Sequence, residues 1–382
     1  MRHRVLSRFD LLCFSHLRWD FVFQRPQHLL TRCARDRRVF YVEEPIFEDG
    51  IAPRLERHPR GNVTVVVPHL PAGQDDHDEM QRALVDDLIA QEDIADYVVW
   101  YYTPMALAFT DHLTPVSVVY DCMDELSAFK GAPTALKQRE AALMRAASLV
   151  LTGGQSLYEA KRAQHHNIHP FPSSVDVKHF AQARAMTFEP ADQAAIPHPR
   201  LGFFGVIDER MNLVLIRDVA AARPDWHVVM LGPVVKIDPA TLPVAPNLHY
   251  LGGKKYEELP AYIAGWDVAL LPFALNESTR FISPTKTPEY LAAGKPVVST
   301  SIRDVVRPYR QQGLVRIADD AASFVSACEA AMAEDAVARM TSADAFLRRM
   351  SWDGTWNRIE VLVNATLAPP EAAVSTEIAA AL

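Results

Sequence analysis

Short apolar runs rich in β-branched and aromatic residues recur along the whole chain and are separated by helical stretches. They lie at 10–15, 39–44, 63–68, 97–102, 116–121 and 148–153, more weakly at 168–172, and then at 201–206, 226–233, 247–252, 267–273 and 296–300. Continuous apolar strands that alternate with helices are typical of parallel sheets covered on both faces. Two such series predict an α/β protein with two doubly wound halves.

The length of 382 residues also favours two domains, because a single core rarely grows beyond about 250–300 residues. The polar, proline-bearing stretch at 173–198 is typical of a domain boundary. We expect a first domain at 1–180 and a second at 181–350. Apolar residues at helical spacing predict a closing helix at 351–367 that packs back toward the first domain. The remaining 368–382 lacks anchoring side chains and is expected to be a disordered tail.

The composition argues against several classes of protein. Apolar residues make up 49% of the chain and charged residues 23%, as in a soluble globular protein. The formal net charge of −8 argues against nucleic acid as the main partner. No apolar run is long enough to span a bilayer, and the first residues lack the apolar core of a signal peptide. Four scattered cysteines without a CxxC pair fit a reducing cytoplasm and offer no zinc site: Cys13, Cys33, Cys122 and Cys328.

Residues 1–40 are unusually basic for a chain that is acidic as a whole. Nine arginines stand against three acids, and they are Arg2, Arg4, Arg8, Arg18, Arg25, Arg32, Arg35, Arg37 and Arg38. A solvated helix face explains such a run in the simplest way. The alternative is attraction to anionic lipid or to a phosphorylated acceptor, which predicts peripheral contact with the inner face of a membrane.

The stretch 279–300 (TRFISPTKTPEYLAAGKPVVST) concentrates the features of a ligand site. It predicts a polar loop, a short helix that carries Glu289, a stop at Gly294 and a buried strand. The free amides of a first helical turn bind anions. Lys286 suits a phosphate and Glu289 suits a pair of ribose hydroxyls, so the segment predicts a nucleoside diphosphate site that needs no metal. An ordinary capped helix with an exposed Glu is the alternative.

Two helix starts fit this segment. Ser283 can cap the helix with Pro284 at its first position. Because a proline disfavours the helical conformation of the residue before it, Thr287 can instead be the cap and Pro288 the first residue. Either start leaves the amides around Thr285 and Thr287 free for a diphosphate.

The words SPTKTPEYLAAGKPVVST resemble the donor-binding segment of GT-B-fold glycosyltransferases near family 4, the glycosyltransferase group 1 enzymes. In that family a Glu, seven residues and a second Glu mark the site. The second Glu holds the donor ribose and matches Glu289. The first falls at Phe281, where this sequence departs from the pattern, so the neighbouring amides and the 283–286 loop are candidates to contact the transferred sugar. The resemblance implies two doubly wound Rossmann-like domains facing a central cleft.

The resemblance covers most of the chain in order. The words LGFFGVIDERMNLVLI (201–216) match the strand and loop that open the second domain of the family. Gly205 is expected to permit close backbone approach. Arg210 is the nearest match to a basic residue that reaches the diphosphate, where a guanidinium can bind in bidentate fashion and stabilise the leaving group. A surface arginine is the alternative. Lys286 is expected to share this catalytic role.

The first half resembles a subgroup of bacterial envelope-polysaccharide sugar transferases. The matching words lie at 19–30, 120–131 and 173–180. In related enzymes a polar residue at the end of the fifth strand, here 116–121, contacts the reacting sugar. The resemblance therefore makes Asp121 and Asp124 the expected acceptor-side residues. A cap of the next helix is the alternative for Asp121, and a metal pair is disfavoured by the two parallel-sheet halves. Arg25 and His28 are candidates for acceptor or phosphate contact, with a structural role as the alternative.

Two further groups follow strand ends in the first half. His16 follows the first strand and is a candidate for the cleft, although a lone histidine is more often structural. Gly153 and Gly154 are expected to form a tight strand-to-helix turn, with Gln155 or Ser156 as the helix cap.

These features predict a glycosyltransferase that moves a sugar from a UDP- or GDP-sugar donor to a saccharide or lipid-linked acceptor. The resemblance implies retention of anomeric configuration without a metal, and no cofactor is expected beyond the donor itself. A noncatalytic nucleotide-sugar-binding protein, or a phosphorylase or epimerase on the same fold, remains open. An oxidoreductase is disfavoured because no GxGxxG follows the first strand at 10–15.

Overall fold

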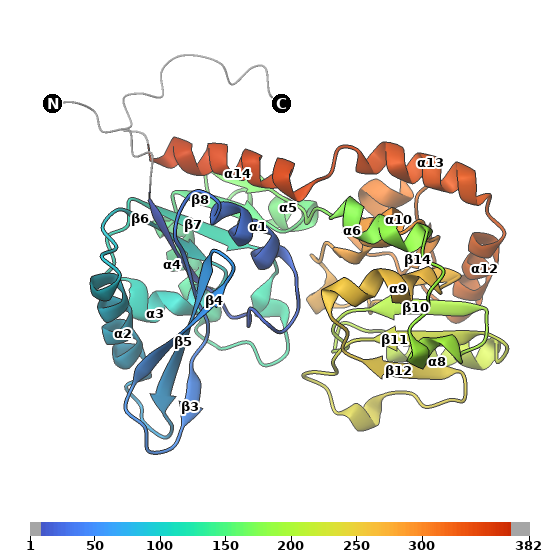
Figure 1. Cartoon of the computed structure of the whole chain (residues 1–382), viewed down its shortest axis with the longest axis horizontal. Coiled ribbons are helices and arrows are strands. Elements are labelled where there is room, and N and C mark those ends of the chain that lie inside the picture. Colours follow the sequence, from blue (N-terminus) through green and yellow to red (C-terminus); the bar gives the residue numbers. More distant parts are fainter. Residues whose placement is uncertain (1–8, 368–382) are drawn as a thin grey trace, which may run out of the picture.

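The computed structural model describes residues 9–367 and divides them between two α/β halves (Figure 1). The first half is built on a nine-stranded sheet in the order β3-β5-β2-β1-β6-β7-β8-β9, with β4 paired to β5. Its strands are β1 (Asp10–Phe14), β2 (Val39–Val42), β3 (Ile46–Glu48), β4 (Arg54–Arg60), β5 (Val63–Pro71), β6 (Tyr97–Tyr101), β7 (Ser117–Cys122), β8 (Leu149–Thr152) and β9 (Ile168–Pro170). In the parallel register Leu12 lies opposite Phe40 on one side and Val99 on the other.

The second half contains a six-stranded sheet in which every pairing is parallel. Its strands are β10 (Arg200–Phe204), β11 (His227–Leu231), β12 (Leu248–Gly252), β13 (Val268–Leu271), β14 (Val297–Ser299) and β15 (Arg316–Ile317). The order β12-β11-β10-β13-β14-β15 reverses direction beside β10. Ligands of such sheets bind beyond the carboxyl ends of the strands at this reversal, which directs attention to the loop after β10.

Helices cover both sheets. The α-helices are α1 (Arg25–Cys33), α2 (His77–Gln91), α3 (Leu107–Thr110), α4 (Leu136–Ala146), α5 (Gln155–Lys161), α6 (Val177–Ala181), α7 (Ala191–Ala194), α8 (Leu213–Ala222), α9 (Leu259–Ala264), α10 (Lys286–Ala292), α11 (Arg303–Val305), α12 (Ala321–Met332), α13 (Ala336–Leu347) and α14 (Trp352–Thr366). Single turns are η1 (Pro104–Ala106), η2 (Leu126–Ala128), η3 (Gln182–Arg184), η4 (Pro239–Thr241), η5 (Tyr256–Glu258), η6 (Glu277–Thr279) and the π-type η7 (Val306–Arg310). In the described part of the chain, none of these helices has the length and apolarity needed to cross a membrane.

Helix α14 returns from the second half to the first, where it lies along α1 (Figure 1). Ser351 caps it by accepting a hydrogen bond from the amide of Gly354 at 3.0 Å, as expected of a serine N-cap. Its buried stripe joins the first hydrophobic core and consists of Trp352, Trp356, Ile359 and Val363. These residues are spaced by three or four, so one face of the helix completes a core built mainly from residues before 172.

The chain enters the second core before the predicted boundary. Val175 and Phe180 are buried in the cluster that the second sheet organises, and α6 packs against α9 and α10. The division at 180/181 remains a prediction. The predicted tail at 368–382, together with Arg2, Arg4 and Arg8, lies outside the described residues.

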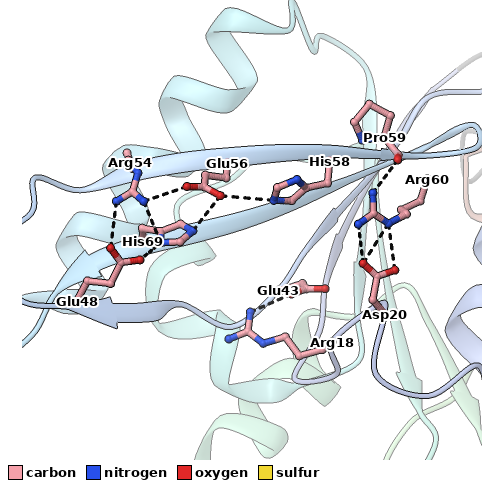
Figure 2. A network of polar contacts seen from close by, with 10 residues as sticks. All are labelled: Arg18, Asp20, Glu43, Glu48, Arg54, Glu56, His58, Pro59, Arg60 and His69. Atoms are coloured by element: carbon pink, nitrogen blue, oxygen red, sulfur yellow. Dashed lines mark hydrogen bonds and ion pairs between the residues drawn. The ribbon is translucent and has the colours of Figure 1, made fainter. Parts of the chain in front are cut away.

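Every predicted apolar run contains a strand, but β3, β4 and β15 were not predicted. Strand β4 runs antiparallel to β5, so the expectation of purely parallel sheets is wrong at this edge. Its sequence RLERHPR carries no apolar alternation. Polar contacts hold this strand in place instead (Figure 2). Arg54 lies 2.9 Å from Glu56 and 3.7 Å from Glu48, and His69 of β5 contacts the same two carboxylates.

Candidate donor and acceptor site

Helix α10 begins between the two predicted starts. Thr285 is its N-cap residue, without a side-chain hydrogen bond, and Lys286 is its first residue. Pro288 is therefore third in the helix, where its missing N–H removes no intrahelical bond. Both predicted starts, with Ser283 or Thr287 as the cap, are wrong. The amide of Thr287 is also not free, since it donates to the Pro284 carbonyl at 3.2 Å.

The predicted stop of this helix is confirmed. Gly294 has φ +76° and follows the C-cap residue Ala293. Its amide donates to the Leu291 carbonyl at 3.0 Å. A left-handed residue after the last turn is the usual glycine helix end, and it turns the chain into the buried strand β14.

Glu289 is buried without a complete set of partners. Its side chain lies in the first turn of α10, it is 8% exposed, and its Oε2 atom has no hydrogen-bond partner among the described residues. Burial raises the pKa of Glu289, and the nearby charge of Lys286 opposes the rise. Burial likewise lowers the pKa of Lys286, against the charge of Glu289. A buried polar atom without a partner is costly, so this carboxylate is suited to accept hydroxyl groups from a ligand.

Gly205 makes room for Lys286. It has φ +132°, and a Cβ added there would overlap Lys286 Cε and lie 2.6 Å from Nζ. The close approach predicted at this glycine is thus made by the lysine side chain. The ammonium lies 5.7 Å from the ring centroids of Phe203 and Phe204. The end of β10 and the start of α10 therefore meet, and their contact fixes the position of the cation.

Arg210 follows Gly205 in the loop after β10 and is held by Asp208. The carboxylate of Asp208 is 5% exposed and accepts from Arg210 Nε at 2.9 Å and from Nη2 at 2.7 Å. This pair was not predicted, although the spacing Asp-x-Arg beside the glycine is a usable signal. Because Asp208 occupies the Nε edge of the guanidinium, a diphosphate has access only to the other edge, through Nη1.

Asp124 brings the first domain to the same place. It follows β7 and is half-buried, and burial raises its pKa to about 6. The charge of Asp208 adds to the rise, whereas the charges of Arg210 and Lys286 oppose it. These influences place one carboxyl of the first domain opposite the cations of the second. Of the predicted site residues, Asp124, Arg210, Lys286 and Glu289 thus influence one another electrostatically, which groups them in one region.

Asp121 does not belong to this group. It is fully buried and forms an ion pair with Arg25, whose Nε lies 2.9 Å from Oδ2. Burial raises the pKa of Asp121, and Arg25 opposes the rise. Arg25 Nη1 also donates to the Phe171 carbonyl at 2.5 Å. The expected acceptor contact of Asp121 and the expected phosphate contact of Arg25 are therefore wrong, because each side chain is turned into the core and neutralised there.

The two histidines predicted as candidates, His16 and His28, have separate surroundings. His28 is buried and stacks on Trp352 with centroids 4.4 Å apart, and burial, followed by the charge of Arg32, lowers its pKa to about 3. It is a packing residue between α1 and α14. His16 keeps a buried Nδ1 atom without a partner among the described residues. Burial and next the charge of Lys236, from the second domain, lower the pKa of His16 to about 4.

The second domain caps a helix of the first. Asp304 accepts from the amide of Ser156 at 3.0 Å and 3.3 Å, and the N-cap residue of α5 is Gly154. The predicted cap by Gln155 or Ser156 is therefore wrong. A Cβ added at Gly154 would overlap Asp304 and lie 2.9 Å from Ser283 Cβ. The glycine turn after β8 is thus one place where the two domains are in direct contact.

The six described arginines of the basic first segment are already paired with carboxylates. The pairs are Arg18 with Glu43, Arg25 with Asp121, Arg32 and Arg35 with Asp353, Arg37 with Glu360, and Arg38 with Asp10. Two of the partner acids lie on α14, so much of this charge holds the returning helix. Membrane contact through this segment remains a prediction.

Solved structures define the class of the fold. A sucrose-phosphate synthase from Thermosynechococcus elongatus is similar with a TM-score of 0.72, at 14% identity, over 94% of this chain and 99% of that chain. A UDP-forming trehalose-phosphate synthase from Burkholderia xenovorans gives 0.69, at 12% identity, over 95% and 100%. The HepE protein of Anabaena, in complex with UDP and glucose, gives 0.67, at 14% identity, over 94% and 100%. The two halves therefore have the GT-B fold.

Within that fold, the second half carries a recognised domain. Residues 198–334 match the family model described as glycosyl transferases group 1, so this segment, which holds every predicted donor-site residue, is a domain of that family. The Bacillus subtilis (strain 168) protein TuaH, named as a glycosyltransferase of teichuronic acid biosynthesis, is 28% identical over 141 residues. That match spans 35% of this chain and 35% of that protein.

Proposed function

We propose that the protein is a glycosyltransferase that moves a sugar from a nucleoside diphosphate donor, UDP- or GDP-linked, to a saccharide or lipid-linked acceptor. The observation that carries the proposal is the buried Oε2 atom of Glu289, left without a partner among the described residues beside a half-buried lysine. The ribose hydroxyls of a donor supply the missing hydrogen bonds. In this proposal Lys286 and Arg210 bind the diphosphate that is attached to the ribose. The comparison proteins named with UDP or a UDP-sugar support this choice of ligand.

In the proposed reaction the bond between the anomeric carbon and the diphosphate oxygen breaks, and a bond to an acceptor hydroxyl oxygen forms. Negative charge develops on the departing diphosphate, and Lys286 with the Nη1 side of Arg210 stabilises it. Retention of the anomeric configuration requires the acceptor to approach the same face of the anomeric carbon from which the phosphate departs. The departing phosphate oxygen then takes the acceptor proton, while Asp124 accepts a hydrogen bond that orients the acceptor. The two cations take the place of a metal ion.

A noncatalytic nucleotide-sugar-binding protein is the second candidate, and Phe281 favours it. This residue stands where the family pattern has its first Glu, and it packs against the core of the first domain. Binding of a donor without turnover to any acceptor would support this candidate. A phosphorylase or epimerase would instead depend on free phosphate, or act without an acceptor.

The first test is the thermal stability of the chain with UDP, GDP, ADP, CMP and NAD, each with and without magnesium. A ligand at about a hundred times its dissociation constant stabilises a protein by roughly 2.7 kcal/mol, which a melting experiment detects. We expect one nucleoside diphosphate to raise the melting temperature whether or not magnesium is present. Stabilisation by NAD alone would contradict the proposal, and so would stabilisation only with magnesium.

Membrane association is a separate part of the proposal. Vesicles of anionic lipid should retain the protein at low salt and release it at high salt, because salt screens exposed charges. Neutral vesicles are the control. Absence of retention at low salt would leave a soluble saccharide as the acceptor.

A further inference from the structure

A hollow lies in the first domain, at the carboxyl ends of β1, β2 and β6. Its volume is about 330 Å³, within the range of small-molecule pockets. Helices α2, α3 and α4 close it from the outside. The side chains that matter for its chemistry are Phe14, Glu43, Glu44, Phe47, Gln81 and Phe109.

Aromatic rings form part of its wall. Phe109 meets Phe14 edge to face, with ring centroids 5.7 Å apart, which leaves the outer ring fixed by packing. Phe47 of β3 is 51% exposed although it is large and apolar. Gln81 on α2 supplies an amide on the opposite wall. A fixed aromatic surface with a few polar groups suits a sugar ring, which has an apolar C–H face and a rim of hydroxyls.

The carboxylates of this hollow are not equivalent. Glu43 is fully engaged, because it accepts from Arg18 Nη1 at 2.9 Å and from the amide of Trp19 at 2.7 Å. Figure 2 shows Glu43 directed at Arg18, away from the other acids. Glu44 is exposed, and within residues 9–367 its side chain forms no hydrogen bond or ion pair with another residue. The other two charged side chains of the lining, Arg139 and Asp78, pair with each other at 3.6 Å. Glu44 is therefore the one carboxylate of the lining without an ion-pair partner among the described residues.

Charged groups of both domains act on Glu44. The pKa of its carboxyl is raised because the surrounding protein shields part of it from solvent, and the charges of Arg18 and then of Lys236 oppose the rise. Lys236 belongs to the second domain and lies 5.4 Å from the ring centroid of Phe129. The guanidinium of Arg210 lies 5.6 Å from the same ring. Lys236, Phe129 and Arg210 are thus neighbouring groups between Glu44 and the proposed diphosphate site.

We propose that this hollow is the acceptor-sugar subsite, and that it takes a neutral or amino-bearing hexose unit rather than a uronate or a sugar phosphate. The inference rests on the proposed function. Glu44 accepts hydrogen bonds from the hydroxyl or ammonium groups of the sugar, and the aromatic wall covers its C–H face. An anionic sugar is rejected because its charge would face a carboxylate that has no ion-pair partner among the described residues.

The test measures sugar binding directly, by ligand-observed NMR on the full chain without a donor. The sugars are glucose, glucosamine, glucuronate and glucose 6-phosphate. We expect the first two to bind in preference to the anions. Glu44→Gln should weaken glucosamine binding by at least about tenfold, since hydrogen bonds to a charged group contribute roughly 1.5–3 kcal/mol. Phe47→Ala should weaken both neutral and amino sugars.

Asp87→Asn is the matched control, because Asp87 is exposed on α2, the helix that carries Gln81. It should leave all four affinities unchanged. Binding of glucuronate or glucose 6-phosphate as tightly as glucose would overturn the inference, and so would binding unaffected by Glu44→Gln. UDP binding, measured in parallel, separates the two proposals. Sugar binding that depends on Glu44 in a chain that ignores nucleotides would leave the subsite standing and refute the donor site.

Discussion

A buried carboxylate and a half-buried ammonium that influence each other determine the chemistry at the scale of single residues. Burial alone drives Glu289 and Lys286 toward their neutral forms, because a low-dielectric environment disfavours both charges. Each also favours the charged form of the other. A bound diphosphate adds negative charge beside the lysine, and donor hydroxyls solvate the carboxylate. Donor binding therefore supplies the hydrogen-bond partners that the Glu289 carboxylate lacks in the free protein.

Glu289→Gln should weaken nucleoside diphosphate binding by about ten- to a hundredfold, since the charged acceptor is lost while the size of the side chain is kept. The melting temperature of the free protein should not fall, because the substitution removes a carboxylate that is costly to bury. Calorimetric titration with UDP and GDP measures the first effect and a thermal melt the second. Unchanged nucleotide affinity would refute the assignment of Glu289.

Asp124 should impose an acidic limb on the pH profile. Its pKa is raised to about 6 by burial, so the ionised form that orients the acceptor is lost as the pH falls through that value. We expect kcat/KM for the acceptor to decline below pH 6, and Asp124→Asn to show low activity without that limb. If the limb persists in the variant, another group titrates there.

The same raised pKa also affects stability. The folded state binds the Asp124 proton more tightly than the unfolded chain, so stability decreases as the pH rises from about 4 to about 6. Asp124→Asn should flatten this part of the curve of unfolding free energy against pH. Urea denaturation at several pH values tests this.

Gly205→Ala should damage the site in two ways. The backbone has φ +132°, which strains any other residue by about 1–3 kcal/mol, and the new Cβ would displace Lys286. We expect a lower melting temperature and weaker diphosphate binding together. Gly313→Ala is the control, because it has φ +71° with no atom within 4 Å of the added Cβ. It should lower stability while leaving nucleotide affinity unchanged.

At the scale of elements, the cap of α5 by Asp304 joins the two domains, beside the ion pairs of Glu159 on the same helix with Arg303 and Arg307. Asp304→Ala should cost about 0.5–2 kcal/mol, as the loss of a cap does, and should widen the range of inter-domain distances in fluorescence energy transfer. Asp335→Ala removes a cap within one domain, where Asp335 accepts from the amide of Ala338 at 2.8 Å. It should cost similar stability without any change in those distances. Equal distance distributions in the two variants would contradict a linking role for Asp304.

Elements with a strong apolar pattern could be predicted from the sequence, whereas those held by polar contacts could not. The central strands are continuous apolar runs, and all of them were expected. Strand β4 pairs with the next strand along the chain, but its polar sequence carries no apolar alternation to mark it. The Asp304 cap depends on a partner remote in sequence, so it has no local signal. Asp121 lies near the end of β7 and Asp124 just after it, and only packing decides that one pairs with Arg25 while the other is near the cations of the second domain. The partner of Arg210, Asp208, was missed because its role is visible only once the side chains meet.

At the scale of the whole molecule, α14 makes the first domain discontinuous in sequence. Trp352 stacks on His28 of α1, and Asp353 pairs with Arg32 and Arg35. Trp356→Ala should destabilise the first domain by about 3–5 kcal/mol, as loss of a buried tryptophan does. The second domain should keep its affinity for nucleotide. Nucleotide binding together with denaturant melts followed by tryptophan fluorescence would separate these effects.

The return of α14 also bears on how the protein is made. During synthesis the nine strands of the first sheet leave the ribosome well before the helix that completes their core. The helices and strands of the second domain are contiguous from α6 to α13. All of them are therefore synthesised before α14 completes the first domain. The apolar surface that Trp352 and Trp356 finally cover stays exposed throughout that interval. We therefore expect the nascent first domain to depend on chaperones, or to fold slowly, until α14 has been synthesised.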